Sequence, residues 1–130
     1  MEARCHTWLC IRERYLVKLP NAENAVIDIA KLRDYCLNPK HPEGKHKARV
    51  FLGALDIDKN DAEQLRQIIL KAVSLAEAIE KEPSEFGRRF IVDFRISWAK
   101  ESVTRTALIR TAWIVKIDED FPRLATCFIL

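Results

Sequence analysis

Glycine and long apolar runs are scarce in this chain. Its 130 residues include three glycines, yet 48% of the residues are hydrophobic, and no low-complexity stretch or internal repeat occurs. This composition excludes an intrinsically disordered chain, because it can bury enough apolar surface to form a core. No apolar run approaches the roughly 20 residues of a membrane-spanning helix, and no signal peptide is recognisable. We therefore expect one cytoplasmic domain of ordinary size without a membrane segment.

Motifs for metal binding are also missing. The four cysteines, at positions 5, 10, 36 and 127, have no framework spacing. None forms the Cys-x2-Cys pair that is typical of zinc sites. Cys5, His6 and Cys10, joined by His41 or His46, come nearest to a zinc ligand set. We expect free thiols in a reducing compartment, no bound metal and no cofactor.

Charge is distributed unevenly along the chain, although the formal net charge is only +3. Residues 31–49 contain six basic and two acidic residues, and residues 88–116 contain seven basic and two acidic residues. Residues 55–85, between them, contain four basic and eight acidic residues. Clustered basic residues favour a polyanionic partner such as RNA. The alternative is that the charges segregate by chance and serve only solubility.

Apolar residues recur at helical spacing in the first part of the chain. We predict three helices, at about 28–36, 45–55 and 60–81. Asn60 with Glu63 resembles a capping box at the start of the third helix. Residues 1–17 show no clean period, so we interpret them as an N-terminal extension of a single domain that spans residues 18–130.

The apolar period changes from 3.6 to two after Pro83, which indicates β-strands. We predict strands at about 90–98, 102–116 and 124–130. The alternating apolar residues of the first strand, from Phe90 to Trp98, should face the helices. The order of the elements predicts an α+β fold in which about three N-terminal helices pack on one face of a three- to four-stranded antiparallel sheet.

A proline-containing loop precedes the second predicted helix. Asn38-Pro39 and His41-Pro42 disfavour helical conformation before each proline, and Gly44 allows a turn that other residues resist. This loop and the start of the helix should bring basic side chains to the edge of the fold, where they could bind an anion. These side chains are His41, Lys45, His46 and Lys47. The alternative is a solvated connector.

Charged and hydroxyl side chains should also occupy the face of the sheet that the helices leave open. They are Asp93, Arg95, Thr104, Thr106 and Arg110. Arginine offers a planar set of donors that matches phosphate, and threonine adds a hydroxyl. A nearby histidine could transfer the proton of an RNA 2′-hydroxyl, while Lys47 and Arg110 stabilise the developing negative charge. The alternative is an ordinary solvent-facing sheet.

Several short motifs occur in an order that resembles a known family over residues 18–130. They include Leu19-Pro20-Asn21-Ala22-Glu23-Asn24-Ala25, Leu37-Asn38-Pro39, His41-Pro42, Thr106-Ala107, Trp113-Ile114 and Arg123-Leu124. Together they resemble a bacterial domain family of unassigned function. Its members occur as stand-alone proteins and at the C-termini of contact-dependent inhibition toxins and phage head proteins. Such toxin domains are similar to the barnase, EndoU, colicin and RelE class of metal-independent ribonucleases.

The resemblance implies a toxin-like, metal-independent endoribonuclease of a toxin–antitoxin or related conflict system. Its substrate would be tRNA or mRNA, and a small antitoxin-like protein would be its partner. Lys47 and Arg110 would hold the phosphate, His41 or His46 would act as acid or base, and Thr106 would orient the phosphate. Further substrate contacts would come from Lys45, Arg95 and Thr104.

The sequence departs from the ribonuclease pattern in one respect, because it lacks a Glu-His pair at barnase-like spacing. The main alternative is therefore a non-catalytic binding or assembly module that pairs with a small partner protein or binds nucleic acid. A transcriptional regulator is a weaker alternative, since no helix-turn-helix signature is present.

Overall fold

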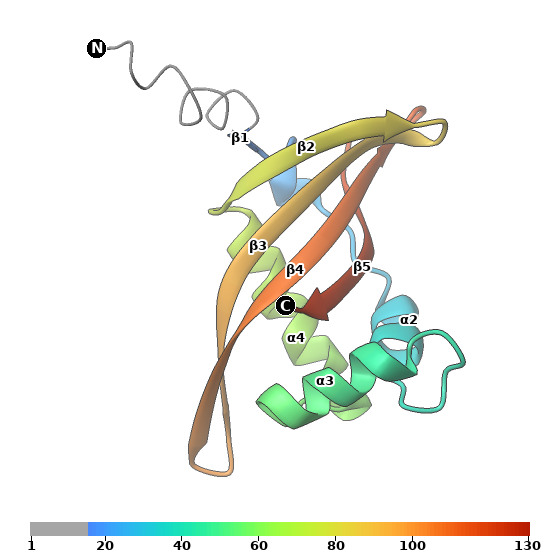
Figure 1. Ribbon diagram of the computed structural model, residues 1–130. Helices are drawn as coiled ribbons and strands as arrows, with labels where there is room; N and C mark the ends of the chain where they lie inside the picture. The colour runs from blue at the N-terminus through green and yellow to red at the C-terminus, as the bar shows by residue number, and fades with distance from the viewer. Residues whose placement is uncertain (1–15) are drawn as a thin grey trace, which may run out of the picture.

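A five-stranded antiparallel sheet runs through the computed structural model, which describes residues 16–130 (Figure 1). The strands follow one another in the order β1-β2-β3-β4-β5. Their bounds are Leu16–Lys18 for β1, Glu77–Ser84 for β2, Gly87–Lys100 for β3, Val103–Lys116 for β4 and Arg123–Ile129 for β5. A separate parallel bridge between Val26 and Arg123 joins the segment after β1 to the outer edge of β5.

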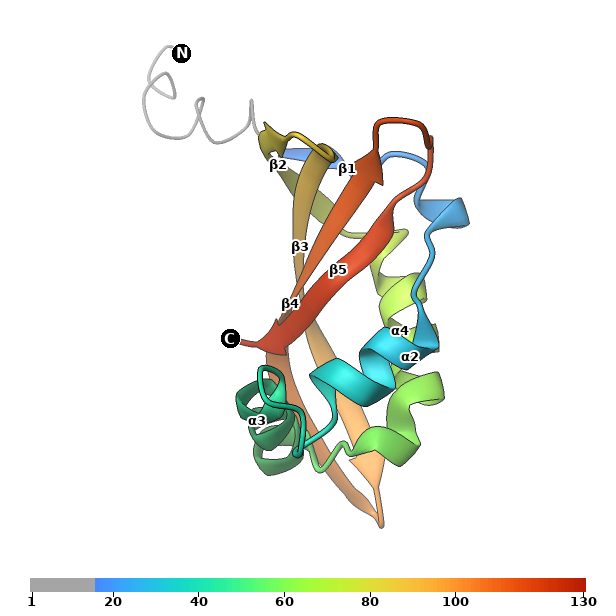
Figure 2. The same cartoon turned by 90° about the vertical axis from the view of Figure 1, so that its right-hand side faces the viewer.

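The helices of the described residues lie between β1 and β2. They are η2 (Ala22–Asn24), α2 (Ile29–Lys31), η3 (Leu32–Cys36), α3 (Lys45–Leu55), η4 (Lys59–Asp61) and α4 (Ala62–Val73). The short α2 continues into η3, a π-helical turn that ends where the Leu37 amide donates to the Leu32 carbonyl. Figure 2 shows α2 and α4 on one side of the sheet, with α3 beneath the end of β5.

The fold predicted from the sequence is wrong in two respects. One strand precedes the helices, and the sheet has five strands rather than three or four. β2 also occupies residues that the sequence analysis assigned to the end of a long helix at 60–81. Leu75 is 72% exposed, whereas Ala78 is fully buried in β2. Pairing with β3 thus overrides the helical periodicity after Val73.

The helical layer is fixed to the sheet near the start of α4. The capping box there is formed by Asp58 and Asp61, not by Asn60 and Glu63 as predicted. Lys100, at the end of β3, donates to the Asp61 carboxylate and to the Asp56 carbonyl, each at 2.9 Å. The tip of the β3–β4 hairpin is therefore held against the start of α4.

The ribbon formed by β3 and β4 has one buried face and one open face, as the alternation of apolar residues predicted. Its register runs continuously from Gly87 opposite Lys116 to Lys100 opposite Val103. The face toward the helices supplies much of the core: Phe90, Val92, Ile96, Trp98, Ile109 and Trp113. Thr111 is fully buried on this face, where its hydroxyl donates to the Val92 carbonyl at 2.8 Å and accepts from Trp113 Nε1 at 2.8 Å. The other face is open to solvent.

Gly44 is required at the start of α3 for a reason other than the predicted turn. Its φ of −88° and ψ of −9° are ordinary right-handed values that most residues adopt. A Cβ at this position, however, would lie 1.9 Å from the carbonyl oxygen of Tyr35. The missing side chain therefore allows the loop before α3 to pack directly on η3.

We predict that Gly44→Ala lowers the free energy of unfolding by about 2 kcal/mol, because a backbone carbonyl must move to admit the methyl group. Gly53→Ala is the matched control, since a Cβ there meets nothing within 4 Å and lies inside α3. It should raise stability by roughly 0.5–1 kcal/mol. Urea denaturation measures both changes. Equal stability of the two variants would contradict the proposed packing.

Candidate nucleic-acid interface

The residues that the sequence analysis singled out fall into two groups in the structure. His41, Lys45, His46 and Lys47 belong to the loop before α3 and to its first turn. Arg95, Thr104, Thr106 and Arg110 belong to the open face of β3 and β4. Whether the two groups could act on one ligand depends on where each side chain lies along the strands.

His41 closes the loop that leads into α3. Its Nδ1 accepts hydrogen bonds from the backbone amides of Glu43 and Gly44, each at 3.0 Å. The ring also contacts Tyr35 edge-on, with 4.8 Å between the ring centroids. Because Nδ1 is an acceptor in this arrangement, the proton of the neutral imidazole is assigned to Nε2. Nδ1 is therefore engaged in the fold, and only Nε2 remains for chemistry.

Lys47 lies over the side chain of Tyr35. Its Nζ donates to the Tyr35 hydroxyl at 3.3 Å and lies 5.1 Å from the ring centroid. Lys47 is half-buried, whereas the neighbouring His46 is exposed. The first turn of α3 thus offers one cation that is positioned by an aromatic ring and one imidazole that is open to solvent.

A shallow groove of about 390 Å³ lies between α3 and the end of β5. Its lining residues are His46, Lys47, Val50, Phe128 and Ile129. Phe128 stands opposite Arg110 in the β4–β5 register, so the two residues share the open face of the sheet. The groove therefore adjoins the open face at Arg110.

Arg110 is paired with Asp93 across β3 and β4. Its Nε and Nη2 donate to the two carboxylate oxygens at 2.9 and 2.8 Å. The hydrogen bond to Asp93 raises the pKa of Arg110, so the guanidinium stays charged. At the same time, the negative charge of the Asp93 carboxylate weakens the attraction of Arg110 for an incoming anion. Arg110 thus lies beside the groove as half of an ion pair rather than as a free cation.

The predicted threonines lie farther along the open face. Thr106 is opposite Ser97 and Thr104 is opposite Ala99, toward the tip of the hairpin. Arg110 lies four residues beyond Thr106 along β4, which corresponds to roughly 13 Å. Arg95, opposite Leu108, lies between them. The structure therefore groups His46, Lys47 and Phe128, with Arg110 adjacent, and does not bring Thr104 or Thr106 to this groove.

Several residues of this region were missed by the sequence analysis as parts of a site. Tyr35 and Phe128 are the aromatic residues beside Lys47. Cys36 and Cys127 are both fully buried behind the groove, and Cys36 Sγ lies 3.9 Å from Thr126 Oγ1. No spacing signal in the sequence connects these positions, because they come from opposite ends of the domain.

The two buried thiols shift each other's ionisation. A hydrogen bond from Cys127 lowers the pKa of Cys36, with smaller contributions from Thr126 and the charge of Lys47, while burial opposes the shift. The same thiol contact and burial raise the pKa of Cys127. A negative charge in this pair is therefore favoured on Cys36.

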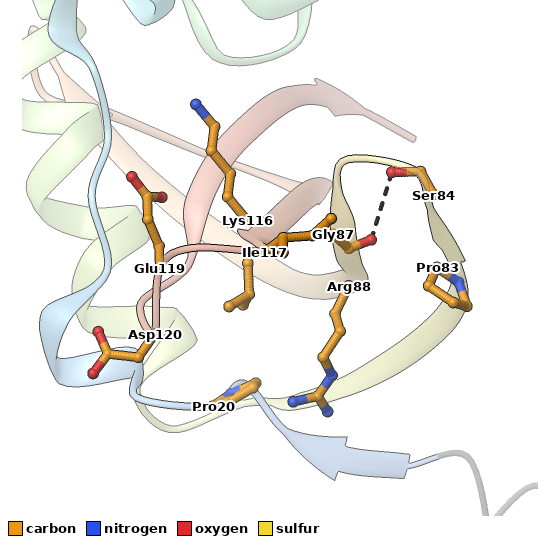
Figure 3. A pocket seen from close by; sticks show the side chains of 10 residues that line it. Pro20, Pro83, Ser84, Gly87, Arg88, Lys116, Ile117, Glu119 and Asp120 are labelled. Carbon is orange, nitrogen blue, oxygen red and sulfur yellow. Dashed lines mark hydrogen bonds between the residues drawn. The ribbon is translucent and has the colours of Figure 1, made fainter.

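A second hollow, of about 470 Å³, lies between the β2–β3 turn and the residues that follow β4 (Figure 3). Charges of both signs surround it, including Arg88, Lys116, Glu119 and Asp120. No residue that the sequence analysis proposed for the site lines it. Its mixed charge gives no preference for a polyanion.

Metal binding and membrane insertion can be considered for the described residues alone. Within residues 16–130, no group of three or more His, Cys, Asp or Glu side chains is placed to hold a metal ion. The possible ligands Cys5, His6 and Cys10 lie outside this range. In the same range, no helix is long and apolar enough to cross a membrane.

The fold and groove define an α+β domain with a small, partly basic surface groove. Comparison with known families shows that residues 18–130 match DUF6883, a domain of unknown function, and the chain therefore belongs to that family. No curated protein and no solved structure matches the chain. The resemblance to a family of unassigned function is thus confirmed, whereas the comparisons contain nothing about toxins, phage heads or ribonucleases.

We predict that His41 has mainly a structural role. His41→Ala should lower the free energy of unfolding by about 1 kcal/mol, because two backbone amides lose their acceptor. His41→Asn should recover most of this loss, since an Asn side chain can accept from the same amides. Chemical denaturation of the two variants tests this role. If His41→Ala is as stable as the wild type, the loop does not depend on the imidazole.

Proposed function

We propose that this domain binds single-stranded RNA in the groove between α3 and β5 and cleaves it without a metal ion, as a toxin-like endoribonuclease. The observation that supports this proposal best is the lining of the groove. An imidazole from His46, an ammonium group from Lys47 and an aromatic ring from Phe128 meet in one open depression.

This combination suits single-stranded RNA better than a duplex or a small anion. Aromatic side chains stack on unpaired bases, and neighbouring cations hold the phosphates that flank each base. Phe128 would stack on the base, and Lys47 would bind the adjacent phosphate. Arg110, next to Phe128 on the open face, would contact the following phosphate while it remains paired with Asp93.

Cleavage would use the 2′-hydroxyl of the bound RNA. His46, which is exposed, would accept the 2′-hydroxyl proton as that oxygen attacks phosphorus and the 5′-oxygen leaves. The 5′-oxygen would take a proton from water or from the protonated imidazole, and a 2′,3′-cyclic phosphate would remain. Lys47 would stabilise the extra negative charge on the phosphoryl oxygens.

The remaining predicted residues take secondary parts in this proposal. Lys45, at the N-terminal end of α3, and Arg95, on the open face, would extend the basic surface around the groove. Thr104 and Thr106 would contact only a longer RNA that continues along β4. A small, acidic antitoxin-like protein would inhibit the domain by covering the same groove, and the substrate would be tRNA or mRNA.

A non-catalytic nucleic-acid-binding module is the second candidate, and a specific observation favours it. Two groups that the sequence suggested for catalysis already have partners within the protein: His41 Nδ1 with two amides, and Arg110 with Asp93. A domain in which these groups serve the fold rather than catalysis would bind RNA and leave it intact.

We predict that the purified protein cleaves single-stranded RNA in the presence of EDTA. His46→Ala should reduce the cleavage rate by about 10²-fold or more, as expected for loss of a general acid or base, with little effect on affinity. Lys47→Ala should lower both rate and affinity. Lys59→Ala is the matched control, because Lys59 is an exposed lysine of η4 that does not line the groove. Denaturing gels measure the rate, and fluorescence anisotropy measures the affinity.

The outcome also separates the two candidates. Intact RNA in every lane, with binding that Lys47→Ala and Phe128→Leu weaken, would support the binding module. Absence of both cleavage and binding, in protein that circular dichroism shows to be folded, would contradict the groove as an RNA site.

A further inference from the structure

A third cavity, of about 220 Å³, lies at the start of β5, whereas the groove lies at the end of that strand. The segment before α2, the end of β4 and the first residues of β5 surround this cavity. Three basic side chains from three different elements line it: Lys31 of α2, Lys116 of β4 and Arg123 of β5. The described lining of the groove contains one lysine and one histidine. The cavity is therefore the more basic of the two.

Hydrogen-bonded main chain forms one wall of the cavity. The Val26 amide donates to the Pro122 carbonyl at 2.9 Å, and the Leu124 amide donates to the Val26 carbonyl at 3.0 Å. β5 also bulges at Ala125, where its register with β4 shifts. β-Bulges redirect side chains and are frequent beside functional sites. The cavity is thus a product of the strand pairing.

Arg123 is held in position by two neighbours. Its Nε and Nη2 donate to the two carboxylate oxygens of Glu119, each at 2.8 Å. Its guanidinium lies over the Phe121 ring, 5.0 Å from the centroid. A guanidinium carries five N–H donors, and Nη1 takes no part in the Glu119 pair. Arg123 therefore offers a pre-oriented donor to a ligand in the cavity.

The two lysines complete the basic lining. Both are exposed, so their ammonium groups can turn toward a bound anion without disturbing the core. Lys116 borders both this cavity and the second hollow, and Figure 3 shows its ammonium group directed away from Arg88.

Asp28 is the one acidic side chain that lines the cavity among the residues that the structure describes. Its Oδ1 accepts from the Ala30 amide at 3.0 Å, so it serves as the N-cap of α2. Three basic residues against one acidic residue leave an excess of two positive charges in the lining. Such an excess suits a dianion better than a neutral ligand or a single carboxylate.

We propose that this cavity binds a phosphate dianion, either free or as the end group of a larger ligand. Two ammonium groups and a guanidinium supply charge-assisted hydrogen bonds from three sides. The volume is below the roughly 300–1,000 Å³ of pockets for drug-sized ligands, so the cavity suits a small anion or one end group. This site goes beyond the proposed function and does not rest on it.

The test titrates the isotope-labelled full chain with inorganic phosphate and follows backbone NMR shifts, with sodium chloride of equal ionic strength as the reference. We expect saturable shifts at residues 26–31 and 123–125. Lys31→Ala and Lys116→Ala should each raise the Kd for phosphate about tenfold, because each removes one charge-assisted hydrogen bond. Lys71→Ala, an exposed lysine of α4 that does not line the cavity, should leave the Kd unchanged.

Asp28→Asn provides a test in the opposite direction. Asparagine can still accept from the Ala30 amide, so the start of α2 is retained. The substitution removes the negative charge that opposes the ligand, and the Kd for phosphate should fall about fivefold. A higher Kd in this variant would contradict a dianionic ligand.

A short RNA with a 5′-phosphate, compared with the same RNA without it, identifies the source of the phosphate. Tighter binding than inorganic phosphate at the same residues assigns the site to an RNA end, and equal or weaker binding assigns it to the free ion; both results support the site. Shifts no larger than those in chloride, or phosphate binding that both lysine variants retain in full, would overturn it. Phosphate binding here by a protein whose groove leaves RNA unbound would support this proposal and contradict the RNA function, so the two fail separately.

Discussion

The continuous pairing of β3 with β4 is the interaction on which the rest of the structure depends. It holds fourteen residues of each strand in one register, so every inward side chain of β3 meets an inward side chain of β4. Thr111 secures the middle of this ribbon, because its hydroxyl satisfies both the Val92 carbonyl and the Trp113 indole inside the core. The same register places Asp93 against Arg110 on the opposite face.

The groove depends on how β5 and α3 attach to this ribbon. β5 pairs with β4 and carries Phe128 to the position opposite Arg110. α3 buries Ala48, Phe51 and Leu55, which orients its first turn and Lys47 toward the end of β5. A basic side chain and an aromatic ring from distant parts of the sequence therefore lie side by side without any local motif.

The sequence analysis was correct for those helices and strands whose local apolar periodicity matches the face that they bury in the fold. The helix at 45–55 and the two strands of the ribbon were placed closely, because their periodicity reflects the single core that they share. Residues 77–81, the first part of β2, were assigned to a helix because the apolar residues there continue a helical period, and only pairing with β3 shows that they form a strand. β1 is three residues long, too short for any period to show.

The site was predictable only in part for a similar reason. His46 and Lys47 are neighbours in the sequence, so the sequence analysis could predict that they lie together on α3. The register of the strands, however, decides which residues of the open face lie near them. Register excludes Thr104 and Thr106 and selects Arg110 beside Phe128. The contact between Cys36 and Thr126 joins η3 to the last strand, and sequence spacing cannot reveal it.

The central claim is that RNA binds in the groove between α3 and β5. The most direct measurement is a titration of isotope-labelled protein with a short single-stranded RNA, followed by NMR chemical-shift mapping. The account predicts that the largest shifts cluster at residues 46–50 and 126–129, with smaller shifts at Arg110, and that they weaken as salt increases. Shifts concentrated at the β2–β3 turn, or none at millimolar RNA, would contradict it.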